Sequence, residues 1–243
     1  MTLVEFLLAF AFFYPLFMSW LWMFGGAYYR LHWENIGGKD YRTLSKLDEY
    51  PFVSMLVPCH NEADNVTLTI EALLAQEWPD FEVIAVNDAS TDNTGALLDR
   101  MASRHPRLRV IHLASNQGKA TGLNTAALVA RGEYLLCVDA DAVPEPTATY
   151  WMMRNFLFSP RVGAVTGNPR IRNRTSVLSR IQVGEFSSII GLIKRAQRIF
   201  GRVFTVSGVI SAYRRTALQQ IGWWNNDMVT EDIDISWRLQ LKH

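Results

Sequence analysis

The sequence is poor in cysteine, and its charges almost cancel. Only two of the 243 residues are cysteines, and the formal net charge is +1 at pH 7. Cys59 and Cys137 each lie in or beside an apolar β-like run, which favours buried thiols in a reducing compartment over a disulfide framework. No Cys-x-x-Cys pair or Cys/His cluster occurs, so a zinc site is not expected. The balanced charge gives no reason to expect nucleic acid as a partner.

The sequence also lacks the two common glycine-rich phosphate motifs. A nicotinamide-dependent dehydrogenase would carry G-x-G-x-x-G after its first strand, and a P-loop enzyme would carry G-x-x-x-x-G-K-[ST]. Neither pattern is present, and the sequence has no internal repeat or low-complexity segment. These absences argue against a dinucleotide-binding domain and a P-loop nucleotide hydrolase.

Charge is missing from one long stretch near the N-terminus. Residues 6–29 form a run of 24 uncharged residues, mostly Phe, Leu, Trp and Met. At about 1.5 Å per residue, a helix of this length spans the roughly 30 Å hydrocarbon core of a bilayer with some tilt. Pro15 lies within the run, where a membrane helix tolerates it as a kink.

The residues flanking this run distinguish an anchor from a signal peptide. A signal peptide would have a positively charged start and a shorter apolar region. Here the start carries Glu5, and the basic residues follow the run, at Arg30, Lys39, Arg42 and Lys46. By the positive-inside rule, the sequence predicts a transmembrane anchor over residues 1–29, with the chain after residue 30 in the cytoplasm.

The rest of the chain has an α/β pattern. Residues 30–50 are polar and are predicted to form a juxtamembrane linker, and residues 51–243 are predicted to form one α/β domain. Strands are predicted at 52–57, 81–86, 108–113, 134–138 and 162–166, and helices at 62–76, 92–103, 119–131 and 146–158. Apolar strands that alternate with helices indicate a mostly parallel sheet flanked by helices on both faces.

Polar or ionisable side chains follow four of the predicted strands. The segments are Pro58-Cys59-His60-Asn61-Glu62, Asn87-Asp88-Ala89-Ser90-Thr91-Asp92, Ala114-Ser115-Asn116-Gln117-Gly118-Lys119 and Asp139-Ala140-Asp141. Ligands of parallel α/β sheets bind outside the carboxyl ends of the strands. We therefore expect these four segments to converge on one site that contains several carboxylates and one lysine.

The pair Asp139 and Asp141 is the sharpest of these signals. Two carboxylates separated by one residue, just past a buried strand, form a hard oxygen site for Mg²⁺ or Mn²⁺, with a diphosphate supplying further oxygens. The structural alternative is a solvated turn that caps the next helix, because Asp is common after strands.

Three further motifs have both a structural and a functional interpretation. Asp88 lies in a turn-rich segment but occupies a strand end, where a carboxylate can accept hydrogen bonds from a nucleoside. Lys119 is either an ordinary lysine in the first turn of a helix or a charge partner for phosphate oxygens. The motif Thr230-Glu231-Asp232 also has two interpretations. In the structural one, Thr230 is an N-cap and the two acids complement the helix dipole; in the functional one, Asp232 is a general base.

The segment from Arg170 to Arg202 is strongly basic. It holds eight Lys or Arg residues and one acid, Glu185, and its apolar residues between positions 177 and 200 recur at helical spacing. This pattern indicates an amphipathic helix, either at a membrane surface or packed with a solvated basic face.

Taken in order, the motifs P-C-H-N-E, N-D-A-S-T-D, N-Q-G-K-A, D-A-D and T-E-D resemble those of a known family. The family is the processive family 2 glycosyltransferases with a GT-A fold, whose outline cellulose, chitin and hyaluronan synthases share. Over residues 162–241 the chain is similar in particular to the bacterial synthases of poly-β-1,6-N-acetyl-D-glucosamine. The long matching runs are VGAVTGNPRIRNR, IQVGEFSSIIGLIKRAQRIFGRVFTVSGVISAYRR and MVTEDIDISWRLQL.

The resemblance implies roles for individual residues. The uridine would be held at Pro58, Asn61, Glu62 and Asp88, and Lys119 would lie near the nucleotide. Asp139 would contact the ribose or the metal, and Asp141 would coordinate the metal. Ser207 and Gly208 would line the acceptor site. Asp232 would be the catalytic base, with Glu231 beside it.

The resemblance also implies an activity and a location. The activity is that of an inverting, Mg²⁺- or Mn²⁺-dependent hexosyltransferase. It would move N-acetylglucosamine from UDP-N-acetylglucosamine to the 6-hydroxyl of a growing β-1,6-linked polysaccharide, a biofilm exopolysaccharide. The location is the bacterial inner membrane, with the lipid bilayer as a partner and the catalytic domain in the cytoplasm. Gram-negative relatives also work with a small membrane subunit and respond to cyclic di-GMP.

The sequence departs from the family at one point. The family continues beyond T-E-D with a Q-x-x-R-W motif and further membrane helices, whereas this chain ends at His243. Gln197-Arg198 lies upstream of T-E-D and has no following Trp, so it is no substitute. We therefore expect the GT-A domain, residues 51–243, to be incomplete at its C-terminus.

Two other functions remain open from the sequence. A haloacid-dehalogenase-like phosphotransferase would use Asp139 as a nucleophile and Asp141 as an acid and base, because an apolar strand precedes D-x-D. Such a motif usually opens its domain, however, and here three βα units precede it. The other alternative is a membrane-bound subunit that binds UDP-sugar or polymer without turnover.

Overall fold

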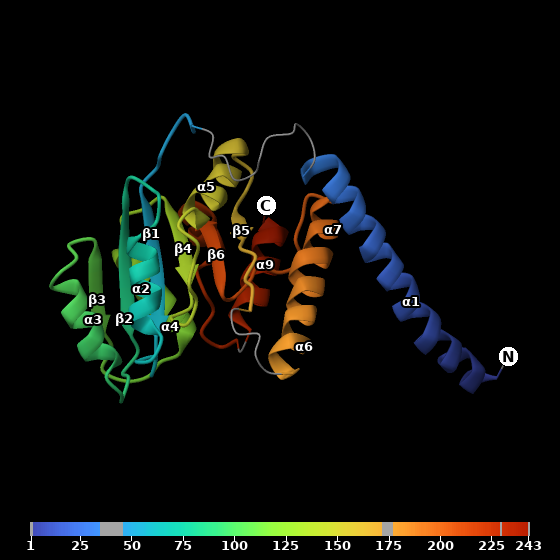
Figure 1. Ribbon diagram of the computed structural model, residues 1–243, viewed down its shortest axis with the longest axis horizontal. Coiled ribbons are helices and arrows are strands. Elements are labelled where there is room, and N and C mark those ends of the chain that lie inside the picture. Colours follow the sequence, from blue (N-terminus) through green and yellow to red (C-terminus); the bar gives the residue numbers. More distant parts are fainter. Residues whose placement is uncertain (1, 35–45, 172–176, 229, 243) are drawn as a thin grey trace. The chain divides into compact units, whose positions relative to one another are not determined.

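The computed structural model describes residues 2–34, 46–171, 177–228 and 230–242, and the chain forms two compact units (Figure 1). The larger unit consists of Lys46–Gly167 and Thr205–His243. The smaller unit consists of Met1–Ser45 and Asn168–Phe204.

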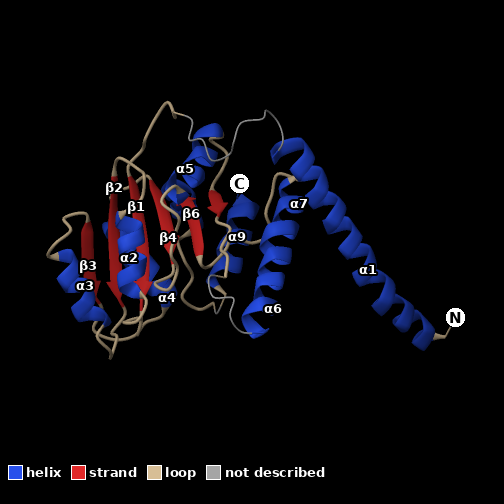
Figure 2. Cartoon of the chain, in the orientation of Figure 1, coloured by secondary structure: helices blue, strands red, loops and turns tan. Residues whose placement is uncertain are grey.

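The larger unit is built on one six-stranded sheet of order β3-β2-β1-β4-β6-β5 (Figure 2). Its strands are β1 (Val53–Cys59), β2 (Phe81–Asn87), β3 (Leu108–His112), β4 (Tyr134–Val138), β5 (Ala164–Thr166) and β6 (Ile210–Arg214). β1 pairs in parallel with β2 and β4, and β2 pairs in parallel with β3, whereas β6 runs antiparallel to β4 and β5. The mostly parallel sheet predicted from the sequence is confirmed.

Helices cover both faces of this sheet. They are α2 (Val66–Leu74), α3 (Thr94–Ala102), α4 (Lys119–Val129), α5 (Ala148–Phe158), α8 (Arg215–Ile221) and α9 (Glu231–Lys242). Leu56 and Ile84 share a core cluster with Leu123 of α4, while α2 lies over the face turned to the viewer in Figure 1. Because both faces are covered, every residue of β2 is buried, which explains the apolar run Val83–Val86 in the middle of the strand.

Five of the strands lie where the sequence predicts them, whereas β6 and the helix α8 that follows it were not predicted. β6 has only five residues and runs against the direction of its neighbour β4. The alternation of parallel strands and helices, on which the sequence analysis relied, does not predict a strand of this kind.

The buried carboxylate of Glu82 links its own strand β2 to β1, to β3 and to the loop before β4. It lies at the edge of the sheet opposite the carboxyl ends of the parallel strands. Glu82 is 1% exposed and accepts hydrogen bonds from the Ser54 hydroxyl at 2.8 Å, the Arg131 backbone N–H at 2.8 Å and the Arg109 guanidinium at 2.9 Å. Burial opposes ionisation of Glu82, but these hydrogen bonds outweigh it and lower the pKa of its carboxyl.

The smaller unit contains a long N-terminal helix, α1 (Leu3–Tyr29), continued by η1 (Arg30–Glu34). The helical segment Leu3–His32 is long and apolar enough, by length and composition, to cross a membrane, with a hydropathy of 1.7. It is the one such segment among the residues that the structure describes. The unit's other helical elements are α6 (Val177–Phe186), η2 (Ser187–Ile193) and α7 (Lys194–Arg198). The helical structure predicted between residues 177 and 200 is therefore present.

Two glycines allow α1 to approach η2 and α7 closely. A β-carbon added at Gly25 would lie 2.7 Å from the β-carbon of Ala196, and one added at Gly26 would clash with the Leu192 side chain. The Arg198 guanidinium also donates to the Tyr29 hydroxyl at 3.0 Å. These contacts hold the C-terminal end of α1 to η2 and α7 within this unit.

We predict that Glu82→Gln destabilises the larger unit by about 1.5–3 kcal/mol at neutral pH, because it weakens hydrogen bonds to a buried charge. Because folding lowers the pKa of Glu82, its contribution to the free energy of unfolding is fully present above the pKa of the unfolded state, about 4.3. The contribution is lost as the pH falls through the lower pKa of the folded state. Urea unfolding in detergent measures the change. The control Glu77→Gln alters an exposed carboxylate and should shift stability by less than about 0.5 kcal/mol. An equal, small effect of both variants would contradict the role of Glu82.

Candidate active site

The carboxyl ends of the parallel strands open into a pocket of about 340 Å³, here called the strand-end pocket. It is lined by Pro58, Cys59, His60, Glu62, Asp88, Asn116, Gly118, Lys119, Asp139, Ala140 and Asp141. The segments that follow β1, β2, β3 and β4 all contribute, because parallel strands end at the same edge of a sheet. The convergence expected from the sequence is therefore present, and the volume suits a small-molecule ligand.

Asp88 is a buried residue of the pocket wall that binds the backbone of the loop before α4. It is 3% exposed, and its two oxygens accept hydrogen bonds from the backbone N–H groups of Gln117 and Gly118, each at 2.8 Å. Gly118 has a φ of 86°, a conformation that favours glycine. Asp88 thus fixes the loop before α4 and, through it, the position of Lys119 at the start of that helix.

Asn61 and Glu62 connect the loops that follow β1 and β2. Asn61 does not line the pocket; it has a φ of 55°, and its side-chain oxygen accepts from the Thr91 backbone N–H at 2.8 Å. The Glu62 backbone N–H donates to the Thr94 hydroxyl at 2.8 Å, while its side chain lies at the pocket wall. Of these two, only Glu62 has a side chain at the pocket.

Two polar side chains of the pocket, His60 and Asn116, lie in segments that the sequence predicted to converge there, but the sequence indicated no individual role for either. Nδ1 of His60 lies 2.7 Å from the Asp88 carbonyl, and Nε2 lies 3.1 Å from the Asn116 amide nitrogen. This arrangement requires the tautomer in which Nδ1–H donates and Nε2 accepts. The sequence signal for His60 was its place in the P-C-H-N-E segment after β1. Its spacing from the other histidines is not that of metal ligands and indicated no role.

The Lys119 ammonium lies at the centre of the site. Its Nζ is 2.5 Å from an oxygen of Asp139 and 3.3 Å from an oxygen of Glu231, and it donates to the Gly208 carbonyl at 2.9 Å. These three partners come from the end of β4, the start of α9 and the loop before β6. One ammonium group therefore connects the strand-end pocket to residues about ninety positions further along the chain.

Burial and neighbouring charges shift two pKa values in this cluster. Burial disfavours the charged form of Lys119, but Asp139 and Glu231 outweigh it and raise the pKa of its ammonium. Burial also raises the pKa of Asp139; Lys119 acts in the opposite direction, and the charges of Asp141 and Glu231 add to the increase. The site holds more carboxylate than its one lysine can balance, which favours a further cation.

Asp139 and Asp141 could supply two ligands of such a cation. Both line the strand-end pocket, with Asp139 partly exposed and Asp141 exposed, so their oxygens are accessible to a bound group. In the part of the chain that the structure describes, no group of three or more His, Cys, Asp or Glu residues is placed to hold a metal ion. The pair fits Mg²⁺ or Mn²⁺ only if a ligand such as a diphosphate provides further oxygens.

Ser207, Gly208 and Asp232 lie beside the pocket on its other side. β6 runs antiparallel to β4 and starts where β4 ends, so the residues before it reach the same edge of the sheet. The Ser207 backbone N–H donates to the Thr166 hydroxyl at 2.9 Å. A β-carbon added at Gly208 would lie 3.3 Å from Oδ2 of Asp232 and 3.7 Å from Nζ of Lys119. Glycine therefore allows Asp232 to approach the lysine cluster closely.

The two cysteines are buried and carry no disulfide. Cys59 lines the strand-end pocket, but burial, together with the charge of Glu62, raises the pKa of its thiol to about 12. Burial likewise raises the pKa of Cys137. Both thiols therefore stay protonated at neutral pH, and a thiolate nucleophile is excluded at this site.

A family profile described as Glycosyl transferase family 2 matches residues 54–222, which is more than half of the chain. Two curated proteins named poly-beta-1,6-N-acetyl-D-glucosamine synthase are also similar. The one from Staphylococcus epidermidis is 40% identical over 232 residues, which are 96% of this chain and 56% of that protein. The one from Staphylococcus aureus strain MSSA476 is 39% identical over 233 residues, with the same coverage of 96% and 56%. The chain thus spans about half the length of these relatives.

Two solved structures are similar in fold. The mannosyltransferase PcManGT from Pyrobaculum calidifontis, in complex with GDP-Man and Mn²⁺, has a TM-score of 0.67 and 25% identity, over 92% of this chain and 62% of that one. TarS 1-349 from S. aureus, in complex with UDP-GlcNAc, has a TM-score of 0.58 and 21% identity, over 79% and 53%. The predicted α/β fold of GT-A type is confirmed.

We predict that Asp88→Asn speeds hydrogen exchange at the backbone amides of Gln117 and Gly118 by about 10- to 100-fold. Asn keeps the size of Asp but turns an NH₂ group toward one of these donors, which removes a hydrogen bond to a charged group. Hydrogen-exchange mass spectrometry over residues 113–120 measures the change. The control Asp99→Asn alters an exposed carboxylate that contacts His112 and should leave this loop protected. Unchanged exchange in Asp88→Asn would show that the carboxylate does not hold the loop.

Proposed function

The chain belongs to glycosyl transferase family 2, and we propose that it transfers N-acetylglucosamine from UDP-N-acetylglucosamine to the 6-hydroxyl of a growing β-1,6-linked polysaccharide. The names of the staphylococcal relatives support this sugar and this polymer, a biofilm exopolysaccharide. The observation that carries the proposal is the position of Lys119, whose ammonium contacts both Asp139 of the strand-end pocket and Glu231 beside Asp232.

The strand-end pocket would hold the donor. Pro58, Glu62 and the loop fixed by Asp88 would surround the uridine, with Asn61 supporting that loop from outside the pocket. Lys119 would place its charge on the diphosphate, since an ammonium is a strong donor to phosphate oxygens. Its Nζ contacts Asp139 in the structure, and we expect donor binding to move it from that carboxylate to a phosphate oxygen.

Asp139 and Asp141 would hold a Mg²⁺ or Mn²⁺ ion together with the diphosphate. A bound divalent ion would neutralise the negative charge that develops on the UDP leaving group. The similar mannosyltransferase contains Mn²⁺ in its complex with GDP-Man. The accessible carboxylates of this pair and the excess of negative charge around Lys119 support the same arrangement here.

Asp232 would act as the general base on the acceptor side. Its carboxylate would take the proton of the acceptor 6-hydroxyl while that oxygen bonds to the anomeric carbon and the bond to the diphosphate breaks. UDP leaves with the bonding electrons, and a single displacement inverts the α-linked donor to a β product. Glu231 would keep Lys119 in place, and Ser207 and Gly208 would line the path of the acceptor.

We place this chemistry on the cytoplasmic side of a bacterial inner membrane. Residues 1–29 would form the anchor, residues 30–50 a juxtamembrane linker and residues 51–243 the catalytic part. The exposed apolar surface of α1 supports a lipid environment, because large side chains such as Leu8, Phe12 and Phe13 are at least 63% exposed along it.

The transfer assay for this proposal uses the chain in membranes, radiolabelled UDP-N-acetylglucosamine, Mn²⁺ and a β-1,6-linked acceptor oligosaccharide. We expect label in the oligosaccharide and release of UDP. Binding of UDP without transfer would favour the non-catalytic subunit. Labelling of the protein by a phosphate donor would favour the phosphotransferase.

We predict that Asp141→Ala removes the dependence of UDP affinity on the divalent ion. The wild-type chain should bind UDP more tightly with Mn²⁺ than with EDTA, because Asp139 and Asp141 would hold an ion whose positive charge favours the diphosphate. Titration calorimetry in both buffers measures the difference. Asp80→Ala, an exposed carboxylate just before β2, should keep the wild-type metal dependence. A metal effect that persists in Asp141→Ala would overturn the metal assignment.

We predict that Asp232→Asn lowers transfer by about 10²–10⁴-fold and leaves UDP affinity nearly unchanged. Asn keeps the size and hydrogen bonding of Asp but cannot take a proton. The assay uses the chain, or a longer version that carries the downstream Q-x-x-R-W elements, and the exposed loop variant Asp227→Asn as control. If Asp232 only stabilises the first turn of α9 through the helix dipole, the substitution should lower the free energy of unfolding by at most about 1 kcal/mol and leave turnover near normal.

A further inference from the structure

The smaller unit contains a pocket of about 670 Å³ that the proposed sugar transfer does not use. It lies beside the C-terminal end of α1 and the start of η1, where Met23, Ala27 and Arg30 line it, and along η2 and α7, where Leu192 and Arg195 line it. Arg170, from the chain just before α6, completes the polar part. All of these residues belong to the smaller unit.

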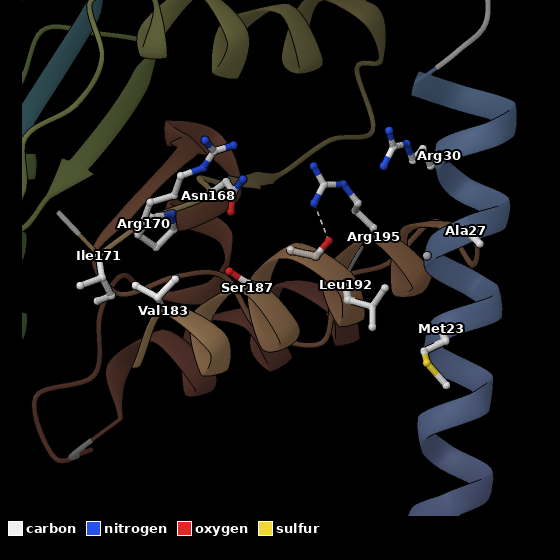
Figure 3. A pocket seen from close by; sticks show the side chains of 13 residues that line it. Met23, Ala27, Arg30, Asn168, Arg170, Ile171, Val183, Ser187, Leu192 and Arg195 are labelled. Carbon is white, nitrogen blue, oxygen red and sulfur yellow. Dashed lines mark hydrogen bonds between the residues drawn. The ribbon is translucent and has the colours of Figure 1, made fainter. Parts of the chain in front are cut away.

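One side of this pocket is cationic. Figure 3 shows the guanidinium groups of Arg170, Arg195 and Arg30 along the same side. Asn168 and Ser187 add a neutral amide and a hydroxyl. No acidic side chain is among the described residues that line the pocket. Three guanidinium groups around one cavity, without a carboxylate in its wall, favour a ligand with phosphate-like negative charge.

The opposite side is apolar. Ile171, Val183, Leu192 and Met23 lie along it in Figure 3, away from the guanidinium groups. Met23 of α1 and Arg30, the first residue of η1, are seven residues apart, or about 10 Å along the helix axis. The pocket is thus polar near Arg30, at the end of the apolar helix, and apolar near Met23, closer to the middle of that helix. A bilayer changes from polar headgroups to apolar acyl chains in the same direction.

We infer that this pocket binds the headgroup of an anionic phospholipid, with the phosphate at Arg30, Arg170 and Arg195 and the first acyl carbons against Met23 and Leu192. The inference rests on α1 crossing the membrane with Arg30 on the cytoplasmic side, and it does not depend on the sugar-transfer chemistry. Basic residues next to a membrane helix attract the anionic cytoplasmic leaflet. A volume of about 670 Å³ also exceeds what a lone phosphate ion fills.

The close packing of α1 gives this site a fixed wall. Gly25 and Gly26 meet Ala196 and Leu192, so the helix that carries Met23 and Arg30 is held against the segment that carries Arg195. A bound headgroup would contact both Arg30 and Arg195, and so would hold the membrane anchor to α7 at the membrane surface.

The test measures lipid binding to the detergent-solubilised full chain. Short-chain phosphatidylglycerol, short-chain phosphatidylcholine and soluble glycerol 3-phosphate are titrated separately, and bound lipid is counted by native mass spectrometry. We expect phosphatidylglycerol to bind at least about tenfold more tightly than either of the other two. Equal affinity for phosphatidylcholine would overturn the inference. Equal affinity for glycerol 3-phosphate would mean a site for soluble anions and would overturn the lipid assignment.

Matched arginine variants separate the pocket from general surface charge. Arg170→Gln, or Arg30→Gln as a second variant, should weaken phosphatidylglycerol binding about five- to tenfold. Arg202→Gln removes the same charge from an exposed position in the same segment, outside the pocket, and should have little effect. Equal losses in Arg170→Gln and Arg202→Gln would show unspecific attraction and contradict the site. Circular dichroism verifies the helix content of each variant.

Discussion

The balance of charge around the Lys119 ammonium is the condition on which the rest of the site depends. Asp139 and Glu231 are more than ninety positions apart in the sequence, yet each has an oxygen within 3.3 Å of the same Nζ. Without that ammonium, two partly buried carboxylates would face each other and repel. Because Nζ also binds the Gly208 carbonyl, the same group fixes the loop before β6.

The fold brings this cluster together through two features of backbone geometry. The antiparallel register of β4 and β6 returns the chain to the edge where the parallel strands end, which is why Gly208 and Asp139 are close. Asp88 binds the N–H groups of the loop before α4 and so determines where Lys119 lies. Both features are contacts within the chain itself, so the fold supplies the position of Lys119.

The sequence alone predicted the parallel strands and most of the strand-end residues, because both leave a periodic pattern. It did not predict β6, the hydrogen bonds of Asp88 or those of His60, since each depends on contacts between distant segments. The grouping of residues 168–204 with α1 was not predicted for the same reason. The contact of Asn61 with the nucleotide stays a prediction; in the structure its side-chain oxygen accepts a hydrogen bond from the Thr91 backbone N–H, a long-range contact that the sequence did not predict.

The most direct measurement of the central claim is a structure of the chain with UDP-N-acetylglucosamine and Mn²⁺. The account predicts that the diphosphate lies in the strand-end pocket, that Nζ of Lys119 leaves Asp139 for a phosphate oxygen, and that Asp141 is a ligand of the metal. A diphosphate bound outside this pocket, or a Lys119 still paired with Asp139 while the donor is bound, would contradict it.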